Sequence, residues 1–287
     1  MSDSSEKKAT SFLNALIAGG MAGTSVDVAL FPIDTLKTRL QAPQGFIKAG
    51  GFTGIYNGLG AAAVGSAPGA ALFFSTYEIM KPIVYDRMEA MGFKDQQAAT
   101  HMIAASMGET MACLVRVPTE VVKAKMQTSG TPLVGTFQQV LKEKHGSPLA
   151  AITGGLYRGY GVTIMREIPF AMIQFPMYER FKVMVGDWQK EPASALQAAA
   201  CGSVSGGIAA AVTTPLDVIK TRLMLGADAH GVQYNGMVDV IQRTHSAEGT
   251  AVFLSGIQPR VMWISIGGFV FFGAYEAYKR SLSPYLD

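Results

Sequence analysis

Two adjacent charged residues, Arg166 and Glu167, lie within a largely apolar stretch and are followed by Pro169. A guanidinium group can hold a carboxylate through two parallel hydrogen bonds, and a neighbouring carboxylate attracts an ammonium group. The pair therefore offers a partner to each charged group of an α-amino acid. A purely structural ion pair is the alternative, but charges inside a membrane span are costly and commonly mark ligand pathways. We therefore predict that both residues bind substrate.

Three further charged residues, Asp27, Glu109 and Arg116, lie five, nine and two residues before a repeated proline, and these spacings keep to one helix face. Glu109 stands where the other two copies of the repeat have glycine. We predict that all three face the same cavity, although a fold-stabilising pair between Glu109 and Arg116 is the alternative. With Arg166 and Glu167, the three acids and two arginines sum to −1. This charge disfavours a polyanion and matches a ligand with one carboxylate and two positive centres.

Aromatic side chains in the same stretches are suited to stack on a flat ring or to face a cation. Packing against lipid or against the protein core is the alternative for each of them. The predicted substrate-binding aromatics are Phe73, Trp263 and Phe271.

The composition indicates a membrane protein. Of the 287 residues only 16% are charged, below the roughly 25% of an average soluble domain, and the mean hydropathy is +0.23. Several stretches have the length of about 20 largely apolar residues that a bilayer requires. A net charge of +3 spread along the chain provides no basic face for a nucleic acid. The two cysteines and four histidines have no metal-binding or redox spacing. We therefore predict no cofactor, no metal, no nucleic-acid partner and no catalytic site.

Internal repeats determine how many spans to expect. The pattern Pro-x-acid-x-x-Lys occurs three times, and each copy is followed by the pattern Tyr-Glu-x-x-Lys. The acids and lysines of the first pattern are Asp34 and Lys37, Glu120 and Lys123, and Asp217 and Lys220. The second pattern consists of Tyr77, Glu78 and Lys81, then Tyr178, Glu179 and Lys182, then Tyr275, Glu276 and Lys279. From proline to tyrosine the distance is 45 residues in the first copy and 60 in the other two, so the first copy has a shortened loop.

Each copy is predicted to supply two membrane-spanning helices, the first running past its proline and the second ending in the tyrosine pattern. The result is an all-α membrane protein with six spans in three pseudo-symmetric repeats. The expected spans are residues 11–41, 60–85, 97–127, 160–185, 195–225 and 260–282. The three repeats are expected at 11–90, 91–190 and 191–287, and residues 1–10 are expected to form a disordered tail. Amphipathic stretches at 136–143 and 238–247 suit short helices at the membrane interface. Gly202 and Gly206 have the spacing that lets membrane helices pack closely.

These repeated patterns resemble those of the mitochondrial carrier family over nearly the whole chain. The resemblance implies a barrel of six tilted helices around a water-filled cavity in the mitochondrial inner membrane. It also implies alternating access through two gates of salt bridges between repeats. A substrate then needs only a few kcal/mol of difference in binding to shift the equilibrium between the two states. The implied matrix gate consists of the pairs Asp34–Lys123, Glu120–Lys220 and Asp217–Lys37, braced by Gln41 and Gln127. The implied cytoplasmic gate consists of the tyrosines, glutamates and lysines of the second pattern.

Segments at 44–56, 166–176 and 210–215 further resemble the members of that family that transport S-adenosylmethionine. This resemblance implies import of S-adenosylmethionine into the matrix in exchange for S-adenosylhomocysteine. The lipid bilayer is the other expected partner, with cardiolipin as a candidate lipid. A carrier of basic amino acids such as lysine or ornithine is the first alternative, because it needs the same acids and the same Arg166–Glu167 pair. A membrane-bound methyltransferase is the second, although the three-fold symmetry of the gates and the lack of an acceptor site disfavour it.

Overall fold

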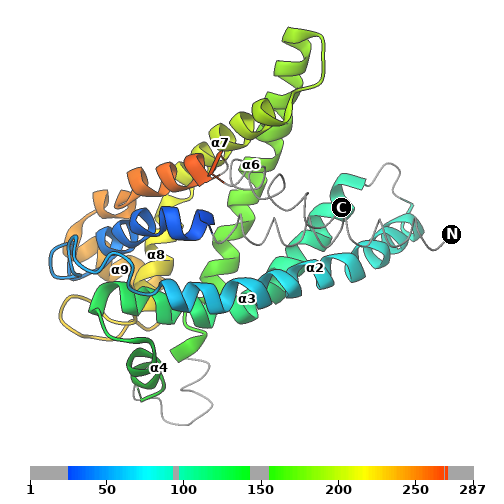
Figure 1. The fold of residues 1–287 in the computed structure, drawn as a ribbon. Helices are drawn as coiled ribbons and strands as arrows, with labels where there is room; N and C mark the ends of the chain where they lie inside the picture. The colour runs from blue at the N-terminus through cyan, green and yellow to red at the C-terminus, as the bar shows by residue number, and fades with distance from the viewer. Residues whose placement is uncertain (1–24, 93–96, 143–154, 268, 271–287) are drawn as a thin grey trace, which may run out of the picture. The chain divides into compact units, whose positions relative to one another are not determined.

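The computed structural model describes residues 25–92, 97–142, 155–267 and 269–270 (Figure 1). Within these ranges the chain is helical apart from turns and one isolated bridge between Ala227 and Gln233. The elements are a helix at residues 25–41, α2 (Leu59–Ala90), α3 (Gln97–Ser129), α4 (Leu133–Lys142), α6 (Tyr160–Gln189), α7 (Ala195–Val212), α8 (Thr214–Leu225), α9 (Met237–Glu248), η2 (Ala251–Leu254) and a helix that begins at residue 257. The expected tail at 1–10 lies outside the described residues, and so do Phe271, Tyr275, Glu276 and Lys279.

Three helices match expected spans in position and length. α2, α3 and α6 contain 32, 33 and 30 residues, so at 1.5 Å per residue each exceeds the roughly 30 Å of a bilayer core. By length and composition together, α2 is the one described helix that can cross a membrane. A second is added if Leu196–Val212 and Thr214–Leu225 are one broken span. α3 and α6 carry the charged residues of the predicted site, which lower their mean hydropathy.

The prolines of the repeated pattern have different effects on their helices. α3 continues through Pro118, whereas the expected single helix at 195–225 is wrong, because the structure has a break at Thr213 between α7 and α8. Pro215 has no N–H to donate, which weakens the helix at this point. The hydroxyls of Thr213 and Thr214 also donate, at 2.7 Å each, to carbonyls one turn earlier in α7. These side-chain hydrogen bonds compete with the regular helix pattern and favour the interruption.

The described residues pack as two compact units. The first comprises residues 25–37, Pro169–Thr214 and the chain from Gly256 onward, and the second comprises Thr38–Ile168 and Pro215–Ser255. The second unit contains the larger hydrophobic cluster. This cluster joins α3 to α8 and to the segment before α6 through the buried side chains of Cys113, Val117, Val121, Leu156 and Met224.

Glycines permit close helix packing within each unit. In the second unit α2 and α3 run side by side, and a Cβ at Gly65 would lie only 2.3 Å from Oγ1 of Thr119 (Figure 1). In the first unit a Cβ at Gly206 would lie 2.9 Å from Cγ2 of Ile264, whereas one at Gly202 would meet nothing closer than 3.8 Å. Of the predicted glycine pair in α7, Gly206 therefore makes the close helix contact.

The two amphipathic stretches form helices close to the expected positions. α4 covers residues 136–142 of the stretch expected at 136–143 and buries Thr136 and Val140. α9 covers the stretch expected at 238–247 and buries Val240 and Thr244. Each helix thus buries residues that lie four apart on one face, as an amphipathic helix does.

Candidate functional site

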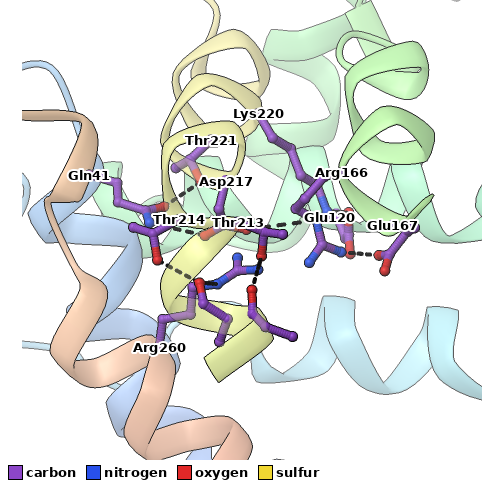
Figure 2. Close-up of polar contacts among 12 residues, drawn as sticks. Gln41, Glu120, Arg166, Glu167, Thr213, Thr214, Asp217, Lys220, Thr221 and Arg260 are labelled. Carbon is purple, nitrogen blue, oxygen red and sulfur yellow. Dashed lines mark hydrogen bonds and ion pairs between the residues drawn. The ribbon is translucent and has the colours of Figure 1, made fainter. Parts of the chain in front are cut away.

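A continuous chain of ion pairs crosses the second unit. It runs through five side chains from three helices: Glu109 and Arg116 of α3, Glu167 and Arg166 of α6, and Asp217 of α8. The acids and bases alternate along it, so each charge has an opposite neighbour. Figure 2 shows the Arg166–Glu167 and Asp217 part of this chain.

Arg116 joins α3 to α6. It lies seven residues, or about two turns, after Glu109, so both side chains share one face of α3. Its Nη1 and Nη2 atoms lie 2.7 and 3.0 Å from the two carboxylate oxygens of Glu109, which is a bidentate pair. Nη1 also lies 3.8 Å from Oε1 of Glu167. The Glu109–Arg116 pair that the sequence offered as a structural alternative is therefore formed, and it continues into the Arg166–Glu167 pair.

Arg166 joins the predicted substrate site to the predicted matrix gate. Its guanidinium contacts the carboxylate of Glu167, and its Nε lies 3.8 Å from Oδ1 of Asp217. The side chain of Asp217 is almost completely buried. The sequence did not predict this contact, because spacing within a helix gives no information about which side chains of another repeat lie nearby. One guanidinium thus serves a predicted substrate residue and a predicted gate residue.

Two predicted components of the matrix gate also meet in this unit (Figure 2). Nζ of Lys220 lies 2.8 Å from Oε2 of Glu120, which is the pair expected between the second and third repeats. Gln41 is fully buried and donates from Nε2 to Oδ2 of Asp217 at 3.0 Å. Its Oε1 accepts a hydrogen bond from the Thr221 hydroxyl at 2.6 Å. Gln41, which was expected to brace the matrix gate, therefore contacts one acid of that gate.

Other predicted residues are distributed over both units. Lys123 and Gln127 lie on α3 in the second unit. Four other predicted site residues belong to the first unit: three lie on the helix at 25–41 and one lies on the helix that begins at residue 257. These residues are Asp27, Asp34 and Lys37 on the former and Trp263 on the latter. Because they belong to a different unit, their roles in the site stay predictions.

The aromatic and gate residues of α2 pack against α3. The ring of Phe73 stacks on that of Tyr77, with centroids 6.2 Å apart and planes at 4°. A Cβ added at Gly108 would lie 3.3 Å from the Phe73 ring, so this ring lies beside the residue that precedes Glu109. The Tyr77 hydroxyl is 2.6 Å from Nδ1 of His101, a partner that the sequence did not predict.

The other described residues of the predicted cytoplasmic gate lie in the second halves of α2 and α6. Glu78 is exposed on α2, and Nζ of Lys81 lies 5.9 Å from the Tyr77 ring centroid. On α6, Nζ of Lys182 lies 3.2 Å from Oε1 of Glu179 and 4.8 Å from the centroid of the Tyr178 ring. The i, i+3 spacing of Glu179 and Lys182 within the helix produces this local pair.

Arg260, which no pattern in the sequence singled out, stabilises the end of α7. Nε of Arg260 donates to the carbonyl oxygen of Ala210 at 3.2 Å, and its Nη2 donates to Oγ1 of Thr213 at 2.8 Å (Figure 2). These contacts satisfy groups at the helix interruption, where regular hydrogen bonds end. The signal in the sequence was a charged residue at the start of a largely apolar stretch.

The chain of ion pairs is suited to bind a zwitterion by partner exchange. The carboxylate of a ligand can pair with a guanidinium such as that of Arg166. The protein carboxylate that loses this guanidinium can then pair with a cationic group of the ligand. Because both signs are supplied together, no unpaired charge is left in the site, which avoids the large cost of an isolated buried ion. Among the described residues, no group of three or more His, Cys, Asp or Glu side chains is placed to hold a metal ion.

Known proteins resemble this chain over most of its length. The model of the family described as "Mitochondrial carrier protein" matches residues 8–50, 44–88, 94–188 and 191–286. A putative mitochondrial carrier protein PET8 from Eremothecium gossypii is 50% identical over 272 residues, which cover 93% of this chain and 97% of the relative. The mitochondrial S-adenosylmethionine carrier proteins of Danio rerio and Mus musculus are each 46% identical, over 94% and 96% of this chain and 98% and 96% of their own lengths. The chain therefore belongs to the mitochondrial carrier family, whose members are multi-pass transporters of the inner mitochondrial membrane and not enzymes.

Proposed function

We propose that this protein imports S-adenosylmethionine into the matrix in exchange for S-adenosylhomocysteine. The observation that carries the proposal is the paired Arg166 and Glu167 within a chain of ion pairs, in a sequence 46% identical to carriers named for that ligand. S-adenosylmethionine has one carboxylate, one ammonium and one sulfonium group. A site of alternating acids and guanidinium groups supplies a partner for each of them.

Each charged side chain has a definite role in this proposal. Arg166 binds the carboxylate of the ligand, and Glu167 binds its ammonium group. Glu109, together with Asp27 from the first repeat, faces the sulfonium, and Arg116 balances the charge of Glu109 when the ligand is absent. One of the predicted aromatics stacks on the adenine; these are Phe73, Trp263 and Phe271.

Transport follows from two gates in a barrel of six helices, two from each repeat. The matrix gate consists of the charged residues of the proline pattern, and the cytoplasmic gate consists of those of the tyrosine pattern, with the bilayer and its cardiolipin around the barrel. The contact between Lys220 and Glu120 and the contacts of Gln41 with Asp217 and Thr221 support the matrix gate. A difference of a few kcal/mol in ligand affinity between the two states suffices to switch them.

The test is uptake of labelled S-adenosylmethionine by purified protein in liposomes. We expect uptake that requires S-adenosylhomocysteine inside the vesicles, and recovery of chemically unchanged ligand from the lumen. We expect external S-adenosylhomocysteine to compete and lysine not to compete. Competition by lysine alone would instead assign the carrier to basic amino acids, and recovery of a demethylated ligand would assign a methyltransferase.

Two single substitutions test the site itself. We expect Arg166→Ala and Glu109→Ala to lower uptake by more than about 30-fold, because removal of one partner of a hydrogen-bonded, partly buried charge pair costs roughly 2 kcal/mol or more. Arg166→Lys, which keeps the charge but loses the bidentate geometry, should be intermediate. Lys142→Ala, at an exposed position in the last turn of α4, is the matched control and should transport like the wild type. Wild-type uptake by either alanine variant would remove that residue from the site.

A further inference from the structure

The turn of α3 that precedes Pro118 has a hydrogen-bond donor from outside the helix. Pro118 lacks an N–H, so the carbonyl of Leu114, four residues earlier, loses its helical partner. The hydroxyl of Tyr157 donates to this carbonyl oxygen at 2.9 Å. One turn earlier, the hydroxyl of Tyr160 donates to the carbonyl oxygen of Thr110 at 2.8 Å. The two phenol rings contact each other edge to face, with centroids 6.3 Å apart. Two tyrosines therefore hold one turn of α3.

This turn connects the charged residues of the site. It lies between Glu109 and Arg116, which form the bidentate pair of α3. Tyr160 is the first residue of α6, and Arg166 and Glu167 follow it in the same helix six and seven residues later, about two turns on. The two hydroxyls thus fix the start of α6 against the segment of α3 that it must face. The 3.8 Å contact between Arg116 and Glu167 is the point where the two charge pairs meet.

The other repeats do not have both tyrosines. Gly58, Gly159 and Gly256 all have positive φ and mark the same position in the three copies. Relative to them, Tyr157 corresponds to Tyr56 and Leu254, and Tyr160 corresponds to Leu59 and Ile257. The second repeat alone has a phenol at both positions. It is also the repeat that contains Glu109, Arg116, Arg166 and Glu167. The asymmetry of the tyrosines therefore coincides with the asymmetry of the charges.

We propose that Tyr157 and Tyr160 are positioning residues for the substrate site: their hydroxyls set the register of α6 against the turn of α3 before Pro118 and so hold Arg116 next to Glu167. The proposal rests on the proposed function for its substrate. It differs from a general stabilising role, because loss of a hydroxyl should change the affinity for the ligand more than the stability of the fold. The rings themselves pack on the cluster around Cys113 and Val117, and this packing is kept when tyrosine is replaced by phenylalanine.

The first measurement is the KM and the maximal rate of S-adenosylmethionine uptake by Tyr157→Phe, Tyr160→Phe and the double variant in liposomes. We expect KM to rise roughly five- to tenfold in each single variant, the effect of about one hydrogen bond, with the maximal rate within about twofold of wild type. The double variant should resemble the singles, since both hydroxyls hold the same turn. Tyr56→Phe makes the same chemical change at the matching position of the first repeat and should leave KM unchanged. A lower melting temperature with unchanged KM would overturn the proposal.

A second measurement does not depend on transport. The thiol of Cys113 is fully buried in the cluster that packs against both tyrosines. In a Cys201→Ala background, Cys113 is the single thiol of the chain, and its rate of reaction with N-ethylmaleimide reports opening of this part of α3. We expect Tyr157→Phe to accelerate the labelling at least about fivefold. Faster labelling in a protein that does not transport S-adenosylmethionine would contradict the proposed function and leave the tyrosine contacts in place. Unchanged labelling would overturn the positioning role.

Discussion

Arg39 and Arg222 occupy matching positions, seven residues after Pro32 and Pro215, and differ in what surrounds them. Each donates from Nε to the main-chain carbonyl of a glutamine at the end of a neighbouring helix: Arg39 to Gln127 at 2.7 Å, and Arg222 to Gln41 at 3.2 Å. The matching contacts show that this base connects one repeat to the next. The rest of each guanidinium has a different kind of partner.

In the third repeat the partner is the amphipathic helix α9. Nη2 of Arg222 lies 2.8 Å from Oε2 of Glu248, and Nη1 donates to the Thr244 hydroxyl at 3.2 Å, both on α9. In the shortened first repeat the guanidinium of Arg39 donates instead to three main-chain carbonyls. These are the carbonyls of Gly51, Thr53 and Gly54, at 2.8, 2.6 and 3.2 Å. Where a loop is too short to contain a helix with a carboxylate, carbonyls of a tight turn satisfy the same cation.

The largest expected effect is that of removing the cation of the first repeat. Arg39→Ala removes an almost completely buried cation and leaves four carbonyls from two segments without this donor. We expect a loss of about 3 to 5 kcal/mol of stability. The measurement is the melting temperature of the purified carrier in detergent. Lys48→Ala removes an exposed charge from the same loop and should change the melting temperature little. Equal effects of the two substitutions would contradict the anchoring role.

Substitution of each arginine by lysine distinguishes a cation held by an ion pair from a cation held by main-chain carbonyls. A lysine at position 222 can still pair with Glu248, so we expect Arg222→Lys to cost about 1 kcal/mol. One ammonium at position 39 cannot reach four carbonyls that surround a planar guanidinium, so we expect Arg39→Lys to cost about 2 to 3 kcal/mol. Melting temperatures of both variants measure the difference. The comparison fails if Arg222→Lys is the more destabilising of the two.

A smaller effect is expected from the glycines that shape the first loop. Gly50 has a φ of +112°, and a Cβ there would lie 2.9 Å from Cζ of Arg39. Gly45 has a φ of +82° and nothing within 4 Å of the same added atom. Both alanine substitutions strain the backbone by roughly 1 kcal/mol, but only Gly50→Ala also displaces the guanidinium. We expect Gly50→Ala to lower the melting temperature by several degrees more than Gly45→Ala does. Equal shifts would show that the Arg39 contacts tolerate displacement.

The sequence predicted those parts of the fold that depend on local patterns. α3 was expected at 97–127 and observed at Gln97–Ser129, and α6 was expected at 160–185 and observed at Tyr160–Gln189. α6 ends four residues later than expected, where Lys190 adopts a positive φ. The break at Thr213 was not predicted, because it depends on hydroxyls that compete for helix carbonyls as well as on Pro215.

The contacts of the site divide in the same way. Glu109 and Arg116 lie seven residues apart in one helix, which places them on the same face, so the spacing alone suggested that they could pair. The contact of Arg166 with Asp217 depends on which faces of α6 and α8 pack together, and no spacing within a repeat contains that information. The same limit applies to the carbonyls around Arg39 and to the tyrosines that hold α3. A repeated pattern identifies which residues form anchors, and the tertiary packing determines their partners.

The smallest expected effect is a dependence on pH that only the loop of the third repeat should show. Arg243 of α9 donates from Nε to Oδ1 of Asp239 at 2.7 Å, and its Nη1 lies 3.3 Å from Oδ2 of Asp228. The hydrogen bond from Arg243 lowers the pKa of Asp239, and the N–H of Val232 lowers the pKa of Asp228, below the ordinary value of 3.8. Because both pKa values are lower in the folded protein, this stabilisation is fully present above the ordinary value. It is lost as the pH falls through the lowered values. The carbonyls around Arg39 do not titrate.

Asp239→Asn tests this dependence. We expect the variant to melt slightly below the wild type at about pH 6, where the carboxylate is ionised, and the difference to be smaller at about pH 2.5, because the wild-type carboxyl takes up protons as the pH falls towards its lowered pKa. Melting curves of both proteins in detergent at the two pH values measure the change. The effect should be small, because both carboxylates are solvated and exposed ion pairs contribute little. A difference that stays constant with pH would show that Asp239 stabilises α9 by its hydrogen bonds to neutral groups, such as the N–H of Asn235, and not by its charge. The loops of the first and third repeats would then respond alike to acid. The contrast between a cation held by a titratable carboxylate and one held by main-chain carbonyls would be limited to the Arg222–Glu248 pair.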